Sequence, residues 1–202
     1  MADFIPPTDD ELVLRTERLL LRPPRTDDAT LLYEHCADPR LSRFMTWAPH
    51  REPGETKTFL EMCVQARRKG TGYTWCLFEG GQFRGFVGME GVVRQMLAVR
   101  YDRAELGYWL GLAYHGRGLM PEAAGAVVAF AFGRLALHKV IVRALAQNAA
   151  SLRVIEKLGF TRVGVARSDV FRDGAWHDHV AFEMLADDDA ARRLQSGLGP
   201  AR

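Results

Sequence analysis

Residues 113–123 read AYHGRGLMPEA and lie between an aromatic, apolar run and a long alanine-rich segment. Gly116 and Gly118 flank Arg117 just before that segment. Glycine loses much conformational freedom on folding, so this spacing indicates a need for bare backbone. One interpretation is an ordinary turn. The other is a nest of main-chain N–H groups that holds phosphate oxygens at the start of a helix.

The flanking residues exclude two familiar phosphate motifs. A Walker loop requires Gly-Lys-Ser/Thr, and this segment has no lysine that could reach the terminal phosphates of a nucleotide. A dinucleotide fingerprint requires a third glycine, but Pro121 stands at that position, and no acidic residue follows about 20 residues later. What remains is a strand, a tight loop and a helix whose first free N–H groups belong to residues 116–120. Such a loop suits a pyrophosphate without a metal.

Hydrophobic periodicity and turn residues predict the elements around this loop. Gly80-Gly81 predicts one hairpin and Asp173-Gly174 predicts another. Thr26 is a candidate N-cap for the first helix, and Asn148 caps a later helix that ends at Gly159. The expected helices cover residues 27–37, 39–45, 55–70, 119–137 and 151–160. The expected strands cover residues 12–22, 73–79, 83–93, 100–111, 139–146, 161–171 and 175–185.

This order of elements predicts an α/β protein of the α+β type, with a mixed central sheet of about seven strands and helices on both faces. The sheet should be antiparallel through its hairpins and parallel where a helix crosses over. Residues 12–186 form the expected single domain. A flexible N-terminal arm is expected over residues 1–11, and a C-terminal tail, either a frayed helix or disordered, over residues 187–202.

The composition narrows the class of protein. The 202 residues carry a net charge of +2 and no long basic run, so no nucleic-acid partner is expected. Cys36, Cys63 and Cys76 are odd in number and lack metal-type spacing, which favours reduced thiols in a cytoplasmic protein. The first residues do not resemble a secretory signal, and no apolar stretch approaches the ~20 residues that span a bilayer. We therefore expect no membrane partner.

Four motifs resemble a known family. YWLGLAYHGRGLMPEA at residues 108–123 and NAASLRVIEKLGF at residues 148–160 resemble the acetyl-CoA site of the GNAT N-acetyltransferases. TERLLLRPPRTDDA at residues 16–29 and WHDHVAFEML at residues 176–185 resemble the RimJ/RimL branch, which acetylates the N-terminal amines of ribosomal proteins. The resemblance implies the GNAT acyl-CoA N-acyltransferase fold, acetyl-CoA as the donor and direct transfer to an amine, without a covalent enzyme intermediate.

The resemblance also implies which residues contact acetyl-CoA. Main-chain groups of strand 100–111 would bind the pantetheine and polarise the acetyl carbonyl, provided that this strand separates from strand 139–146. Ala113 stands where the wider family often has Gln or Arg, so one side-chain contact is missing. The expected cofactor-binding residues are Tyr108, Trp109, Leu110, His115, Gly116, Arg117, Gly118, Leu119, Met120, Asn148 and Ser151.

Two residues are candidates for chemical roles. Glu105 is either a strand charge paired with Arg100 or Arg103 or, as the resemblance implies, the general base that deprotonates the acceptor ammonium. Asn148 and Ser151 lie at a helix start, where capping alone would explain both. The resemblance implies in addition that Asn148 contacts the pantetheine and that Ser151 protonates the departing thiolate.

The sequence says less about the residues that would bind the acceptor amine. Phe44, Met45 and Trp47 lie on an expected loop and either tuck into the core or, as in the resembled family, wall the acceptor pocket. His177 and His179 share a strand face, which period-two alternation explains, and no third ligand has suggestive spacing, so no metal is expected.

Several acceptors fit the same donor site. Branch resemblance implies a protein N-terminal amine, whereas a small-molecule amine or an antibiotic would use the donor in the same way. A non-catalytic acyl-CoA-binding sensor is the alternative from another class, and it would bind coenzyme without turnover. A homodimer would be ordinary, although the sequence indicates no surface for it.

Overall fold

The computed structural model describes residues 4–197. Its centre is an eight-stranded sheet in the order β1-β2-β3-β4-β5-β6-β8-β7. The strands are β1 (Leu14–Arg15), β2 (Leu19–Arg22), β3 (Tyr73–Glu79), β4 (Gln82–Met96), β5 (Val99–Leu110), β6 (Lys139–Leu145), β7 (Thr161–Arg172) and β8 (Ala175–Leu185). Neighbouring strands in this part of the chain are antiparallel, except that β5 and β6 are parallel. The expected mixed sheet is confirmed.

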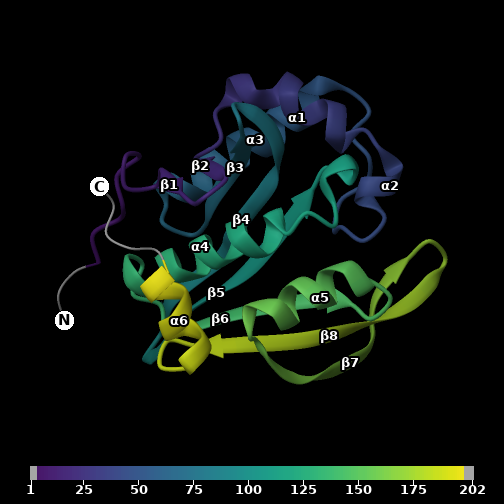
Figure 1. Ribbon diagram of the computed structural model, residues 1–202. Coiled ribbons are helices and arrows are strands. Elements are labelled where there is room, and N and C mark those ends of the chain that lie inside the picture. Colours follow the sequence, from purple (N-terminus) through teal and green to yellow (C-terminus); the bar gives the residue numbers. More distant parts are fainter. Residues whose placement is uncertain (1–3, 198–202) are drawn as a thin grey trace.

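Helices cover both faces of the sheet, and Figure 1 shows α4, α5 and α6 side by side in front of it. Alternate strand residues feed two cores: Trp75 and Val87 point to the α4 side, whereas Cys76 and Phe86 point to the side of α1, α2 and α3. The helices are α1 (Ala29–Cys36), α2 (Pro39–Ser42), α3 (Pro53–Arg68), α4 (Leu119–Gly133), α5 (Ala149–Leu158) and α6 (Asp189–Gly197), with 3-10 turns η1 (Thr26–Asp28) and η2 (Leu112–Tyr114).

The helix α4 forms the crossover that makes β5 and β6 parallel. Its sequence, LMPEAAGAVVAFAFG, is apolar on nearly every side, because one side packs on the sheet and another meets α5 and α6. Pro121 lies in its first turn, where a missing N–H breaks no helical hydrogen bond. The start of α4 follows β5 after the segment of residues 111–118.

Two local predictions at the N-terminal side were wrong. The expected strand over residues 12–22 is divided into β1 and β2, which pair as a hairpin because Thr16 and Leu19 close a turn between them. This division raises the count from about seven strands to eight. Thr26 does not cap a helix. It begins η1, and Asp28 accepts a hydrogen bond from the Arg25 N–H at 2.8 Å instead.

The two glycine-containing hairpins are confirmed. Gly80 and Gly81 have φ of 56° and 79°, and Asp173 and Gly174 have φ of 51° and 80°. The β4–β5 hairpin extends further than expected, to Met96 and Val99.

The ends of the described chain pack against the domain. Glu11 pairs with Arg134 at 2.6 Å, and the Trp75 Nε1–H donates to the Leu12 carbonyl at 2.6 Å. Near the C-terminus, α6 packs against α4. Residues 1–3 of the expected arm and residues 198–202 of the expected tail lie outside the described residues.

Candidate active site

The strands β5 and β6 diverge in a V. Residues 103–105 of β5 pair with residues 139–141 of β6, and the pairing ends there. Beyond this point β5 remains bonded to β4 through Leu110, and β6 remains bonded to β8 through Leu145. The separation expected between these strands is therefore present, with Glu105 at its vertex. The main-chain groups of β5 that face β6 beyond Glu105 are left for another partner.

The loop at residues 116–120 lies at the open end of the V and has the backbone of an anion nest. Gly116 and Gly118 have φ of 77° and 76°, and Gly118 is the N-cap of α4. Within residues 4–197, the main-chain N–H groups of residues 116–120 donate no hydrogen bond. The side chains of Leu119 and Met120 are buried, so these two residues offer a ligand their main chain. Such an array suits phosphate oxygens.

Two arginines lie at this loop. Arg117 pairs with Glu79 at 2.7 Å. Arg18, from the β1–β2 turn, pairs with Glu122 at 2.6 Å and donates to the Arg117 carbonyl at 2.9 Å. A Cβ placed on Gly118 would lie 3.6 Å from Arg18 Nη2. Arg18 thus adds positive charge beside the nest. The sequence did not single out Arg18, because it lies about 100 residues before the nest and its own segment has neither a glycine turn signal nor a phosphate motif.

Asn148, Ser151 and Tyr108 connect the two arms of the V on the α5 side. Asn148 Oδ1 accepts from the Ser151 N–H at 3.1 Å, so the capping role expected of Asn148 is confirmed. The Tyr108 hydroxyl lies 2.9 Å from Ser151 Oγ. Burial raises the pKa of Tyr108 to about 12, although the hydrogen bond to Ser151 acts against it. Tyr108 therefore keeps its proton at neutral pH.

The side chains of three other expected cofactor residues are engaged within the protein. Trp109 stacks on Phe86, with ring centroids 6.1 Å apart, in the core beneath α1–α3. Leu110 is buried in the opposite core, and its carbonyl lies 2.8 Å from His115 Nε2. His115 therefore fixes the entry to the 116–120 loop.

Glu105 is held by an arginine that the sequence did not single out. Arg143 Nε and Nη2 donate to its two carboxylate oxygens at 3.0 and 2.7 Å. The expected partners are engaged elsewhere: Arg100 pairs with Asp102, and Arg103 lies over an aromatic ring. Arg143 belongs to β6, so this pair joins the two arms of the V just beyond its vertex.

Glu90 was also missed. It stands directly opposite Glu105 in the β4–β5 register, and opposed residues share a face of the sheet. A Cβ on Gly107 would lie 3.3 Å from Glu90 Oε1, so the carboxylate lies over β5 where β5 has left β6. The signal that could have found it is the hairpin register, which the turn at residues 97–98 sets.

The loop that contains Phe44, Met45 and Trp47 packs against the core, which is one of the two interpretations that the sequence left open. All three side chains are half-buried, and Met45 and Trp47 pack against the core beneath α1–α3. Arg172, near the tip of the β7–β8 hairpin, donates to the Met45 carbonyl. The loop is thereby tied to a hairpin on the far side of the V.

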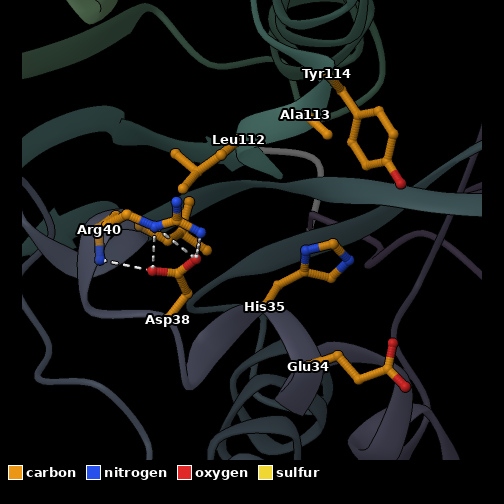
Figure 2. A pocket seen from close by; sticks show the side chains of 8 residues that line it. Glu34, His35, Asp38, Arg40, Leu112, Ala113 and Tyr114 are labelled. Carbon is orange, nitrogen blue, oxygen red and sulfur yellow. Dashed lines mark hydrogen bonds and ion pairs between the residues drawn. The ribbon is translucent and has the colours of Figure 1, made fainter.

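A cavity of about 190 Å³ opens between α1, α2 and η2 (Figure 2). Figure 2 shows His35 beneath Tyr114, and their ring centroids lie 6.4 Å apart. Burial lowers the pKa of His35, which keeps the ring neutral. The cavity adjoins residues 112–114, which lead into the nest. A second hollow, of about 330 Å³, lies beside residues 100–102 at the other end of β5.

The described residues hold no group of three or more His, Cys, Asp and Glu side chains placed to bind a metal ion. His177 lies 2.8 Å from Gln147 Nε2, and His179 lies 2.7 Å from Asp169. In the same part of the chain, no helix has the length and apolar character needed to cross a membrane.

Comparison with known proteins identifies the family. Residues 18–161 match the acetyltransferase (GNAT) domain family. The chain is 39% identical to the probable N-acetyltransferase YjcK of Bacillus subtilis over 95 residues, which are 47% of this chain and 52%, about half, of that protein. It is 28% identical to the [ribosomal protein uS5]-alanine N-acetyltransferase of Escherichia coli over 183 residues, covering 87% of this chain and 91% of that enzyme.

Solved structures agree on the fold. The ribosomal L7/L12 α-N-protein acetyltransferase RimL, in complex with coenzyme A, superposes with a TM-score of 0.80 at 19% identity, over 88% of this chain and 99% of that one. RimJ of Mycobacterium smegmatis superposes with a TM-score of 0.75 at 22% identity, over 88% of each chain. The eight-stranded sheet with helices on both faces is thus the GNAT fold. Because the family model covers well over half of its length, the chain belongs to the GNAT family of N-acetyltransferases.

Proposed function

We propose that this acetyltransferase moves the acetyl group of acetyl-CoA to the N-terminal amine of a protein. The observation that carries the proposal is the combination of a V between β5 and β6 with a free N–H nest at its open end. A pyrophosphate on the nest would direct the pantetheine into the V along the unpaired edge of β5. The 28% identity to an enzyme named for ribosomal protein uS5 alanine supports the choice of acceptor.

The donor contacts follow from this placement. Main-chain N–H groups from Gly116 to Met120 would hold the pyrophosphate, with Arg18 and Arg117 as nearby cations. Asn148 uses its side-chain oxygen as a cap, so its amide N–H groups are the part left for the pantetheine. The main chain of residues 108–110 would polarise the acetyl carbonyl.

Ser151 would protonate the departing thiolate. Its hydroxyl lies 2.9 Å from the Tyr108 hydroxyl, and burial keeps the phenol protonated by raising its pKa to about 12. Ser151 can give its proton to the sulfur while it takes up the proton that the attacking nitrogen releases, so neither hydroxyl oxygen keeps a charge, and the protonated Tyr108 hydroxyl orients Ser151. Both residues lie on the α5 side of the V.

The opposite side would receive the amine. Glu105 and Glu90 present two carboxylates there, and an incoming ammonium is attracted to them and must lose a proton before it attacks. Met45 and Trp47, on a loop tied to the β7–β8 hairpin, would wall the approach of the acceptor.

The same proposal places the enzyme in the cytoplasm, where acetyl-CoA and newly made N-termini are both available. Cys36, Cys63 and Cys76 are free and buried, which fits a reducing compartment.

The test measures acetylation of matched amines by mass spectrometry. The panel contains a short peptide with a free N-terminal alanine, the same peptide with a blocked N-terminus, and a polyamine and an aminoglycoside as small amines. We expect acetylation of the free peptide alone. Faster acetylation of a small amine would contradict the choice of acceptor. Tight acetyl-CoA binding without turnover on any amine would instead favour a sensor.

A further inference from the structure

Glu90 and Glu105 are neighbours with different partners. Glu105 accepts two hydrogen bonds from Arg143, at 3.0 and 2.7 Å. Glu90 makes no hydrogen bond or ion pair with the protein within residues 4–197, and part of the residue is exposed to solvent. The arginine takes up both carboxylate oxygens of Glu105 in a bidentate pair. Of the two groups, Glu90 is therefore the one whose oxygens are free to meet an incoming ammonium.

Glycine at position 107 leaves room for the Glu90 carboxylate beside β5. The Cβ of any other residue there would come within 3.3 Å of Oε1 and 3.6 Å of the carboxyl carbon. Gly107 is the second residue of β5 beyond the pairing with β6, so the carboxylate lies over the edge that would hold the thioester. Glu105 belongs to the last paired position, at the vertex itself.

From these contacts we infer that Glu90 is the catalytic base of the transfer and that Glu105, fixed by Arg143, is a positioning residue that acts through its charge. The inference rests on the proposed function, because it assigns roles within the same site. It differs from the resemblance, which implied Glu105 as the base.

The proton balance is complete with groups on this chain. The acceptor ammonium gives one proton to Glu90, and the neutral amine forms the C–N bond as it attacks the thioester carbonyl. When the C–S bond breaks, the nitrogen loses a second proton and the thiolate gains one, by way of Ser151. Glu90 then returns its proton to water, to which it is accessible. The net products are the amide, coenzyme A and one proton.

The groups that face Glu90 set the direction of its pH dependence. They are Glu105 from β5 and the thiol of Cys63 from α3, with Arg143 of β6 behind Glu105. Desolvation by the surrounding protein raises the pKa of Glu90, and the charge of Glu105 raises it further. Because the base must be ionised, kcat/KM should rise as pH increases through this raised pKa. Removing the charge of Glu105 should lower that pKa and move the acidic limb to lower pH.

The experiment compares Glu90→Gln, Glu105→Gln and Glu183→Gln in the full chain. Glu183 is the matched control, because it lies in the same cross-sheet row, opposite Ile141, and pairs with Lys139 instead. Each variant is assayed for kcat/KM against pH with a free N-terminal peptide, and for acetyl-CoA affinity by calorimetry.

We expect Glu90→Gln to lower kcat about 100-fold or more and to lose the acidic limb, with unchanged acetyl-CoA affinity. Glu105→Gln should lose less than about tenfold and shift the limb to lower pH, and Glu183→Gln should match the wild type. A Glu90→Gln variant with wild-type kcat and acidic limb would overturn this inference alone. A wild type that acetylates no peptide would overturn the proposed function and this inference together.

Discussion

At the scale of single residues, Gly118 tests the nest most directly. Its φ of 76° disfavours any residue with a Cβ, and the substituent would also point toward Arg18. We expect Gly118→Val to weaken acetyl-CoA binding at least about tenfold, because the N–H groups around it can no longer converge on one anion. Calorimetric titration gives the affinity.

Gly174 supplies the matched control for that variant. It has a φ of 80° with open space around it, at the tip of the β7–β8 hairpin. We therefore expect Gly174→Val and Gly118→Val each to lower the free energy of unfolding by about 1–3 kcal/mol. Gly174→Val should leave the acetyl-CoA affinity unchanged. Equal affinities of both variants for acetyl-CoA would mean that Gly118 only makes a turn.

Ser151 carries a second prediction at this scale. Ser151→Ala removes the hydroxyl that Tyr108 contacts at 2.9 Å but keeps the N–H that Asn148 caps at 3.1 Å. We expect kcat to fall roughly fivefold with KM for acetyl-CoA unchanged, since coenzyme A thiolate leaves tolerably well without help. Tyr108→Phe should have a similar effect on kcat. An unchanged kcat for Ser151→Ala would remove this residue from the proton path.

At the scale of elements, Glu122 ties the β1–β2 turn to the first turn of α4. It accepts from the Thr16 hydroxyl at 2.5 Å and from the Arg18 N–H at 2.9 Å, and it pairs with the Arg18 guanidinium. Burial alone would raise the pKa of Glu122, but these hydrogen bonds outweigh it and hold the pKa below its ordinary value of 4.5. The turn and the helix are therefore joined by a carboxylate that must be ionised.

This coupling predicts a pH-dependent stability. Because the folded pKa is depressed, the stabilisation is present above pH 4.5 and is lost as pH falls through the folded pKa. At neutral pH, Glu122→Gln should lower the free energy of unfolding by about 1–3 kcal/mol. Denaturant unfolding at several pH values should show this difference shrinking in acid. A constant difference, or an equal loss in the exposed control Glu17→Gln, would contradict it.

The sequence predicted elements well where their cause is local. Asp173-Gly174 and Gly80-Gly81 adopt positive φ because glycine and aspartate tolerate that conformation. Both hairpins could therefore be predicted from the sequence. The division of residues 12–22 into two strands was not visible, since it depends on Thr16 closing a turn that Glu122 then holds from another element. Thr26 failed as a cap for a similar reason, because Asp28 and Arg22 form an ion pair there.

At the scale of the whole molecule, the candidate site brings together residues from the β1–β2 turn, β4, β5, β6 and the starts of α4 and α5. The nest and Asn148 can be identified from the sequence because glycine spacing and helix capping are local signals. Arg18, Arg143 and Glu90 do not, because each reaches the site through sheet order or strand register, which short-range patterns leave open. The sequence therefore singled out more of the residues around the nest and α5 than of those around Glu90 and Glu105.

If the V and its nest bind acetyl-CoA, calorimetric titration of the purified protein with acetyl-CoA will detect that binding. NADH and ATP serve as controls, since both carry phosphates that an unselective loop would also hold. We expect saturable micromolar binding of acetyl-CoA alone, roughly −8 kcal/mol. No binding of acetyl-CoA, or equal binding of all three compounds, would contradict it.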